Sequence, residues 1–400
     1  MTMTIVWNDW ILLLVRWLHI VTAIAWIGTS FYFIWLDKSL RQRQGLATGV
    51  IGDSWSVHGG GFYQVQKYAV APAELPPELH WFKYEAYFTW ISGFALLAVI
   101  YYFGAASFLL DPSRATLSPA TAVTVSIGFL TGGWLVYEAL CRSPVGNHTA
   151  SLALGVLVLT VASAWGLTQL FNDRAAFVHL GALIGTIMTA NVFVVIIPNQ
   201  KKVVADLMAG HVPDPALGQQ AKQRSLHNNY LTLPVLLLMV SAHYPILFAG
   251  GAAWGWLVVA FILLIGGVIR HFFNSHHAGV RGLALAWQWP LAALLTVALI
   301  LFINSRSSLP AVGMVSDTRA LEILNAHCST CHAAVPTYPG FKAPPGAITL
   351  QSLESLRTHG QGVLAQAVSS TVMPLGNASS MSAQERAELG GWIRQNEKQK

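Results

Sequence analysis

The sequence predicts an all-α protein, in which a polytopic bundle of about eight transmembrane helices is followed by a small soluble helical domain. Of its 400 residues, 54% are hydrophobic and only 10% are charged, whereas a soluble domain carries about 25% charged residues. Long apolar runs fill the first three quarters of the chain, and ordinary soluble composition follows them. We therefore expect a transmembrane domain over 1–304, a linker over 305–317 and a soluble domain over 318–400.

Eight apolar runs are long enough to cross about 30 Å of hydrocarbon. They lie at 10–36, 86–109, 119–141, 149–171, 176–197, 229–249, 252–272 and 284–304. The first run is longer than the apolar part of a cleaved signal peptide and contains Arg16 and His19, so we expect it to be a retained helix. The sixth run contains Pro234 and Pro245, which predict kinks.

The charges of the loops predict an orientation. If the N-terminus is outside, the inward loops hold most Lys and Arg residues, and the outward loops hold little more than Arg114, Arg174 and Arg306. An even number of spans then places the C-terminal domain outside as well. The sequence pI near 9.3 does not indicate nucleic-acid binding, because the basic residues lie in short loops between apolar runs.

The longest inward loop, 37–85, contains several aromatic residues and is expected to include interfacial pieces. Its glycines 59–61 lack the spacing of a phosphate-binding loop. They predict a flexible turn.

The segment Cys328-Ser329-Thr330-Cys331-His332 is the C-x-x-C-H signature of covalent haem c attachment. In that motif Cys328 and Cys331 bind the haem vinyl groups and His332 is the proximal iron ligand. A zinc site would need further ligands at short spacing, and a thioredoxin-like pair would need a βαβ context. Haem c is attached on the outer face of a bacterial cytoplasmic membrane. The motif therefore predicts an inner-membrane protein with its N-terminus and C-terminal domain on the periplasmic side.

Two predicted helices flank the rest of the soluble domain. Residues 318–325 lead into the haem motif, and the capping box Ser382-Ala-Gln-Glu385 opens a terminal helix with an apolar face. This arrangement resembles the small monohaem cytochrome c fold. The resemblance makes Met373, which precedes Pro374, the sixth iron ligand, with Met381 as the alternative. His/Met ligation raises the potential of a haem relative to bis-His ligation, which suits an electron acceptor.

Three histidines and one arginine fall in the outer half of the predicted membrane domain: Arg16, His19, His179 and His243. Ionisable groups inside a membrane are costly and usually face a functional interior. Imidazoles from different helices can hold a haem b, act as acids or bases, or simply form interhelical hydrogen bonds. Arg16 can bind a planar anion or a haem propionate. The residues alone leave these alternatives open.

Four stretches make the chain similar to the membrane-bound urate oxidases fused to a cytochrome c, the PuuD-type urate hydroxylases. They are residues 16–28, 81–93, 188–200 and 227–234. The resemblance implies oxidation of urate to 5-hydroxyisourate in purine catabolism, with electrons passed to the fused haem c. A soluble cytochrome c or a terminal oxidase would then be the downstream acceptor. The first helix is also similar to the opening helix of the membrane protoporphyrinogen oxidases, which supports His19 as a haem b ligand.

No catalytic motif of the membrane domain is carried over by this resemblance. Arg16 and His19 are the residues that we expect to act on the substrate, Arg16 on the urate anion and His19 on its proton. The alternative functions are a quinol- or haem-linked electron-transfer protein without a purine substrate, and a haem-handling or transport module. The side from which urate enters is left open, because purine catabolism favours the inner side and proximity to haem c the outer side.

Overall fold

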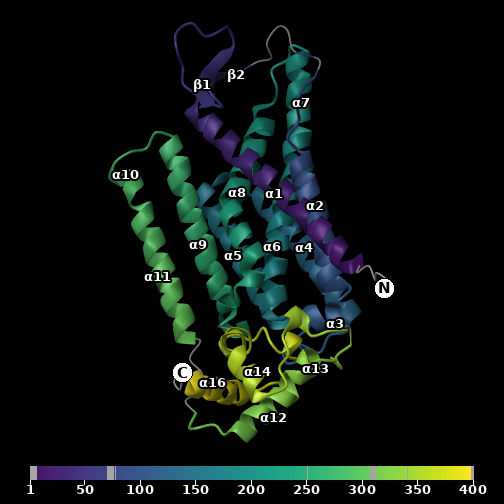
Figure 1. Ribbon diagram of the computed structural model, residues 1–400. Coiled ribbons are helices and arrows are strands. Elements are labelled where there is room, and N and C mark those ends of the chain that lie inside the picture. Colours follow the sequence, from purple (N-terminus) through teal and green to yellow (C-terminus); the bar gives the residue numbers. More distant parts are fainter. Residues whose placement is uncertain are drawn as a thin grey trace.

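The computed structural model describes residues 7–69, 76, 78–249, 251–306, 312–339 and 341–397. Helices run side by side along a bundle, with a β-hairpin at one end and the C-terminal domain at the other (Figure 1). We name these the hairpin end and the C-domain end. The N-terminal helix starts towards the C-domain end and reaches the hairpin end (Figure 1).

Seven segments of the described chain form helices long and apolar enough to cross a membrane. They contain α1 (Trp7–Ser39), α2 (Tyr84–Leu97) with a π-helical turn to Tyr102, α4 (Pro119–Arg142), α5 (Thr149–Leu170), α6 (Asp173–Ala190) continuing into α7 (Ile197–Met208), α9 (Gly251–His277), and α10 (Leu283–Ala286) with α11 (Gln288–Arg306). These correspond to seven of the eight runs in the sequence. The lengths and composition of these helices are consistent with the predicted membrane domain.

The sixth predicted run, 229–249, has different bounds in the structure. Its residues belong to α8 (Pro215–Val240), which begins well before the apolar run, and to two short 3₁₀ turns that follow. α8 packs between α6 and α9 inside the bundle. It does not qualify as an apolar span because its first half is polar, with Gln219, Gln220, Lys222, Gln223 and Arg224 among its side chains.

The prediction of an all-α chain is wrong for the loop 37–85. Strands β1 (Val50–His58) and β2 (Gly61–Tyr68) pair there as an antiparallel hairpin. Gly59 and Gly60 have φ of +56° and +80°, and positive φ at both central residues is what a two-residue type I′ turn requires. The predicted glycine turn is therefore confirmed, and it joins two strands. Residues 70–75 and 77 of the same loop lie outside the described residues.

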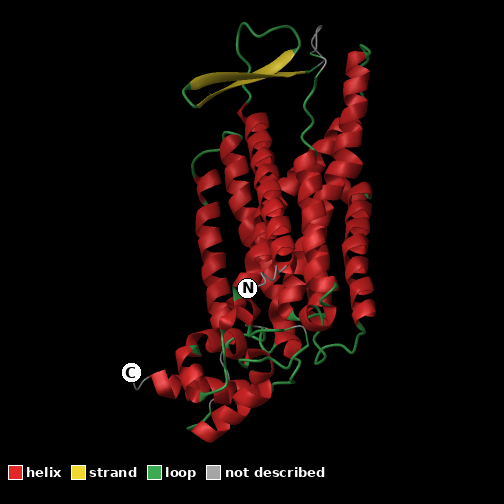
Figure 2. Ribbon diagram, turned by 45° about the vertical axis from the view of Figure 1, so that its right-hand side comes forward, coloured by secondary structure: helices red, strands yellow, loops and turns green. Residues whose placement is uncertain are grey.

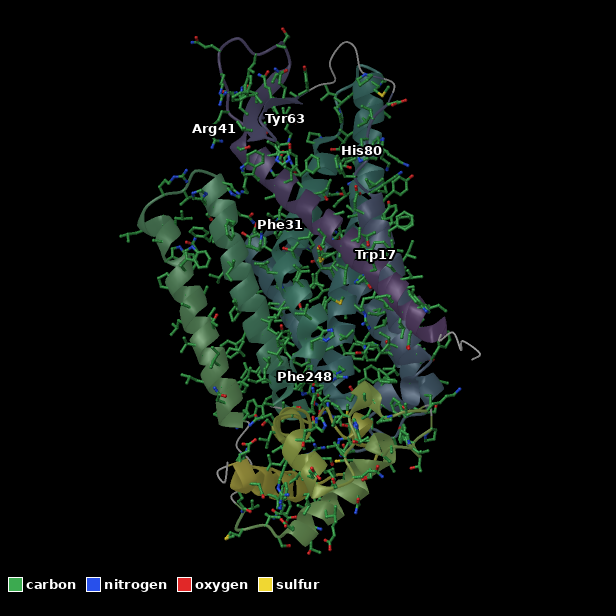
Figure 3. The ribbon with its side chains drawn as sticks, viewed as in Figure 1. Trp17, Phe31, Arg41, Tyr63, His80 and Phe248 are labelled. Carbon is green, nitrogen blue, oxygen red and sulfur yellow. The ribbon has the colours of Figure 1, made fainter. Side chains whose placement is uncertain are left out.

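The core of the bundle is centred on α6. Leu180, Leu183 and Ile184 are fully buried, and α6 packs against α2, α4, α5 and α8. In contrast, α1 lies at the periphery, where Trp17 is 65% exposed (Figure 3). α6 starts at the C-domain end, so its first residues lie next to the C-terminal domain (Figure 1).

The C-terminal domain is a compact group of short helices below the bundle (Figure 2). It contains α12 (Asp317–His327), α13 (Ser329–His332), α14 (Leu353–Thr358), α15 (Gly360–Val363) and α16 (Ala383–Glu397). The predicted capping box is confirmed: Glu385 N–H donates to Ser382 Oγ at 3.2 Å, and Ser382 N–H donates to Glu385 Oε2 at 2.8 Å. The apolar face of α16 is buried in the core of this domain. Residues 307–311 of the predicted linker lie outside the described residues.

Candidate functional site

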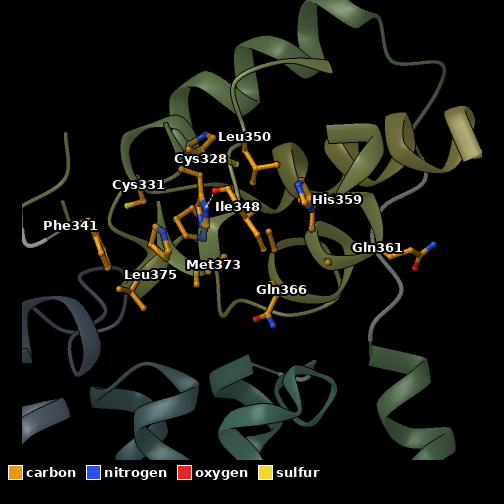
Figure 4. A pocket seen from close by; sticks show the side chains of 18 of the residues that line it. Cys328, Cys331, Phe341, Ile348, Leu350, His359, Gln361, Gln366, Met373 and Leu375 are labelled. Atoms are coloured by element: carbon orange, nitrogen blue, oxygen red, sulfur yellow. Dashed lines mark hydrogen bonds between the residues drawn. The ribbon is translucent and has the colours of Figure 1, made fainter. Parts of the chain in front are cut away.

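A cavity of about 630 Å³ lies between the C-terminal domain and the bundle (Figure 4). Four of the residues singled out in the sequence line it together: Cys328, Cys331, His332 and Met373. Phe108 at the end of α3 (Ala105–Phe108) and Arg174 of α6 line it from the bundle. The candidate site is therefore shared between the two parts of the chain.

The imidazole of His332 is held by its own domain. Its Nδ1 donates a hydrogen bond to the Ile348 carbonyl oxygen at 2.8 Å, and its backbone N–H donates to the Cys328 carbonyl at 2.9 Å. A histidine that donates through Nδ1 keeps the lone pair of Nε2 for an electrophile or a metal ion. The short α13 turn thus sets one open imidazole nitrogen beside two thiols.

Both thiols on this turn are free, Cys328 buried and Cys331 half-buried. Burial raises the pKa of Cys328 to about 11 and raises the pKa of Cys331 above its ordinary value. Both side chains are therefore neutral thiols near pH 7 in the structure as it stands.

Met373 is held at the cavity by the backbone around it. Its N–H donates to the Gln366 carbonyl at 2.8 Å, and its own carbonyl accepts a hydrogen bond of 2.6 Å from Arg386 Nη1. Arg386 also donates to the Ala367 carbonyl at 2.6 Å, so one buried guanidinium joins two parts of the loop. Met381 is 3% exposed and packs in the hydrophobic core of the domain. Only Met373 of these two methionines lines the cavity.

Arg174 is a cation without a partner among the described residues. Its Nε is buried and makes no hydrogen bond there, whereas the neighbouring Arg114 forms ion pairs with Asp111 at 3.0 Å and Asp173 at 2.7 Å. A partly buried charge without a partner is unfavourable. Arg174 is thus ready to bind an anionic group in the cavity. The sequence showed it only as one basic residue of a short loop, and its place became visible only from the packing of α6.

The sequence also predicts that His327 and His359 of this domain are surface residues rather than ligands. His327 is 8% exposed, and its Nδ1 lies 2.8 Å from Ser379 Oγ. His359 is half-buried and lines the cavity. Both histidines are therefore less exposed than expected, and His327 is covered by the loop that carries Ser379.

The intramembrane histidines predicted as haem b ligands occupy three separate environments. His19 of α1 donates through Nδ1 to the Thr89 carbonyl at 3.0 Å, and His179 of α6 donates in the same way to the Ala175 carbonyl at 2.7 Å. His243 is exposed at the turn after α8. No hydrogen bond or ring contact joins any two of these histidines in the part of the chain that the structure describes.

Nε2 remains available in both bonded histidines, as in metal-ligating imidazoles. His179 is enclosed by the rings of Tyr101 at 5.2 Å and Phe171 at 5.5 Å between centroids. His19 is half-buried against α2, where a Cβ at Gly93 would lie 2.8 Å from its Cε1. Arg16 is exposed on α1. Arg16 and His19 therefore both lie on α1, at the periphery of the bundle.

The fold and the site together define a helical protein with seven helices long and apolar enough to cross a membrane, among the described residues, and a C-terminal domain that encloses a cavity against the bundle. Residues 5–304 match the model of the urate oxidase N-terminal family. The chain belongs to this family, and the resemblance found in the sequence is confirmed at that level. The match includes every helix of the bundle up to α11. Comparison with curated proteins and with solved structures gives no match.

Proposed function

We propose that this protein oxidises urate to 5-hydroxyisourate at the membrane and passes the electrons to a haem c in its C-terminal domain. Membership of the urate oxidase N-terminal family supports urate as the substrate. The cavity is the single observation that supports a haem c as the electron acceptor. It gathers two free thiols, an imidazole and a thioether from separate parts of the domain.

The residues around the cavity fit a covalently bound haem. Cys328 and Cys331 would bind its vinyl groups, and His332 and Met373 would be the axial ligands of its iron. Arg174 would balance the charge of a propionate. A haem c bound there accepts one electron at a time. Phe108 and Arg174 would bring it into contact with the bundle.

The oxidation adds one water at C5 of urate and releases two electrons and two protons. Because haem c takes one electron at a time, the reaction needs a second one-electron centre or two successive transfers. A haem b bound by His19, His179 or His243 would supply the second centre, and the open Nε2 atoms of His19 and His179 support this. The sequence assigns the urate anion to Arg16 and its proton to His19, both on α1.

The location that we propose is the bacterial cytoplasmic membrane, with the C-domain end on the periplasmic side. The hairpin end carries several basic residues, among them Lys38, Arg41, Arg43 and Lys67. Positive loops favour the inner side. A soluble cytochrome c or a terminal oxidase would then accept electrons from the C-terminal domain.

Anaerobic reduction of the purified protein tests this function. Urate should reduce the haem c, seen as a rise of its α-band, with formation of 5-hydroxyisourate. Reduction by a quinol but not by urate would instead support an electron-transfer protein without a purine substrate. A pyridine haemochrome spectrum shows whether the protein contains haem b in addition to haem c. A spectrum of haem c alone would eliminate His19, His179 and His243 as haem b ligands.

A further inference from the structure

A second large cavity lies at the opposite end of the bundle from the haem site. It measures about 700 Å³ and is formed by the last turn of α4, the η2 turn (Pro144–Asn147), the π-helical segment η3 (Asn191–Ile196), α7 and the first half of α8. The lining includes five carboxamide side chains: Asn147, Asn199, Gln219, Gln220 and Gln223. The polar half of α8, which is unusual inside an apolar bundle, therefore faces this cavity.

Arg224 is the buried charge of this cavity. It is 3% exposed, and its Nη2 lies 3.0 Å from Glu138 Oε2. Its Nε and Nη1 are buried and have no hydrogen-bond partner among the described residues. Leaving charged donors unsatisfied is costly. Unsatisfied N–H donors of a buried guanidinium favour an acceptor that carries negative charge.

The local charge favours an anion. Glu138 is also paired with Arg142, whose Nε lies 2.6 Å from Oε1. Two guanidinium groups share one carboxylate, which leaves one positive charge at the cavity. The Tyr137 ring covers the inner side of Arg224, 5.2 Å from its guanidinium carbon.

The carboxamides narrow the chemical class of the anion. Gln223 Nε2 donates to the Gly146 carbonyl at 2.8 Å, and Asn199 Nδ2 donates to Gln220 Oε1 at 3.2 Å. These bonds fix the side chains while further amide donors and acceptors stay available. A tetrahedral oxyanion such as phosphate offers mostly acceptors, with one or two P–OH donors near neutral pH. A purine oxo-anion offers alternating N–H donors and carbonyl acceptors, so it can use both sides of each amide.

We infer that this cavity binds urate, with Arg224 on the anion and the carboxamides on the ring edge. The identity of the anion rests on the proposed function. Because the cavity lies at the hairpin end, the predicted orientation has urate enter from the cytoplasmic side. Arg224 thus takes the role of anion-binding residue that the sequence assigned to Arg16.

Binding and reduction measured on the same holoprotein test this assignment. Arg224→Gln should weaken urate binding, by equilibrium dialysis in nanodiscs, roughly tenfold or more, since it removes hydrogen bonds from a charged donor. The KM for urate-dependent haem reduction should rise by the same factor. The matched control is Lys222→Gln, which removes an exposed cation of the same helix outside the cavity lining and should leave both values within about twofold.

Two further variants distinguish a loss of urate binding from a loss of folding. Glu138→Gln with Arg224→Gln removes both partners of the ion pair and avoids a lone buried charge. Gln220→Leu leaves all charges in place, and we expect it to weaken urate binding by a smaller factor. Unchanged urate affinity in these variants would overturn the assignment while reduction by urate in the parent protein leaves the proposed function intact.

Competition with inorganic phosphate separates the two anion classes. Phosphate at the same concentration should displace urate poorly. Displacement as strong as that by unlabelled urate would overturn the purine assignment in favour of a general oxyanion or lipid headgroup site. If the parent protein neither binds urate nor is reduced by it, the proposed function fails together with this inference.

Discussion

Thr371 of the C-terminal domain donates a hydrogen bond of 2.5 Å to Asp173 Oδ2 at the start of α6. Asp173 is 3% exposed and also holds Arg114. Thr371 lies two residues before Met373, so the loop that carries the proposed axial ligand is tied directly to the central helix of the bundle. Docking of the domain and the geometry of its cavity are therefore coupled.

Removing this hydroxyl should loosen the docked loop. Thr371→Val leaves Asp173 without one hydrogen bond, and we expect the free energy of loop opening to fall by about 1 kcal/mol. Hydrogen exchange of residues 371–377 measures it. Thr358→Val is the control, because its hydroxyl bonds only within α14, to the Glu354 carbonyl at 3.0 Å. Equal exchange in both variants would show that the contact does not hold the loop.

The close approach of Gly376 to the bundle gives a second prediction. A Cβ at this position would lie 2.7 Å from the Leu110 carbonyl oxygen, and its φ is +56°. Gly376→Ala should push the domain away from the bundle and slow haem reduction by urate. Gly346→Ala shares the positive φ but meets nothing closer than 3.8 Å, so it controls for backbone strain. If Gly346→Ala slows reduction as much, strain rather than the clash is responsible.

The identity of the axial methionine is tested by the potential of the haem. Met373→Ala should keep the covalent haem but lower its midpoint potential by at least about 59 mV, a tenfold change for a one-electron couple. Met381→Ala should leave the potential near its original value and lower thermal stability by roughly 2–5 kcal/mol, since Met381 is a buried core residue. A fall in potential for Met381→Ala alone would assign the ligand to Met381.

Arg174 should raise the haem potential, because a nearby cation favours the reduced form. Arg174→Gln is therefore expected to lower the midpoint potential by about tens of millivolts in a spectroelectrochemical titration. Arg306→Gln is the control, since its guanidinium stacks 4.3 Å above the Trp254 ring and does not line this cavity. A potential that stays constant in Arg174→Gln would mean that the side chain does not contact the haem.

The sequence predicted the features that depend on local pattern. The apolar runs predicted the long helices. The C-x-x-C-H motif and Met373 predicted four residues that line one cavity in the structure. Features that depend on long-range packing were missed. The first half of α8 is too polar to read as a span, because its side chains face a cavity rather than lipid. The positions of Arg174 and Arg224 at the two cavities were not predicted either, because packing of neighbouring helices determines how far each side chain is buried.

The capping box of α16 should make the C-terminal domain sensitive to acid. The backbone N–H and the hydroxyl of Ser382 donate to Glu385 and lower its pKa from 4.5 to about 2. A lowered carboxyl pKa contributes stability above about pH 4.5, and this contribution is lost as the pH falls towards 2. Glu385→Gln should therefore destabilise the domain by roughly 1 kcal/mol near neutral pH and progressively less in acid. Thermal unfolding of the holoprotein, followed by haem absorbance, measures the difference, with Glu354→Gln at the start of α14 as control. A difference that is the same at neutral pH and at pH below 3 would contradict the role of the Glu385 charge.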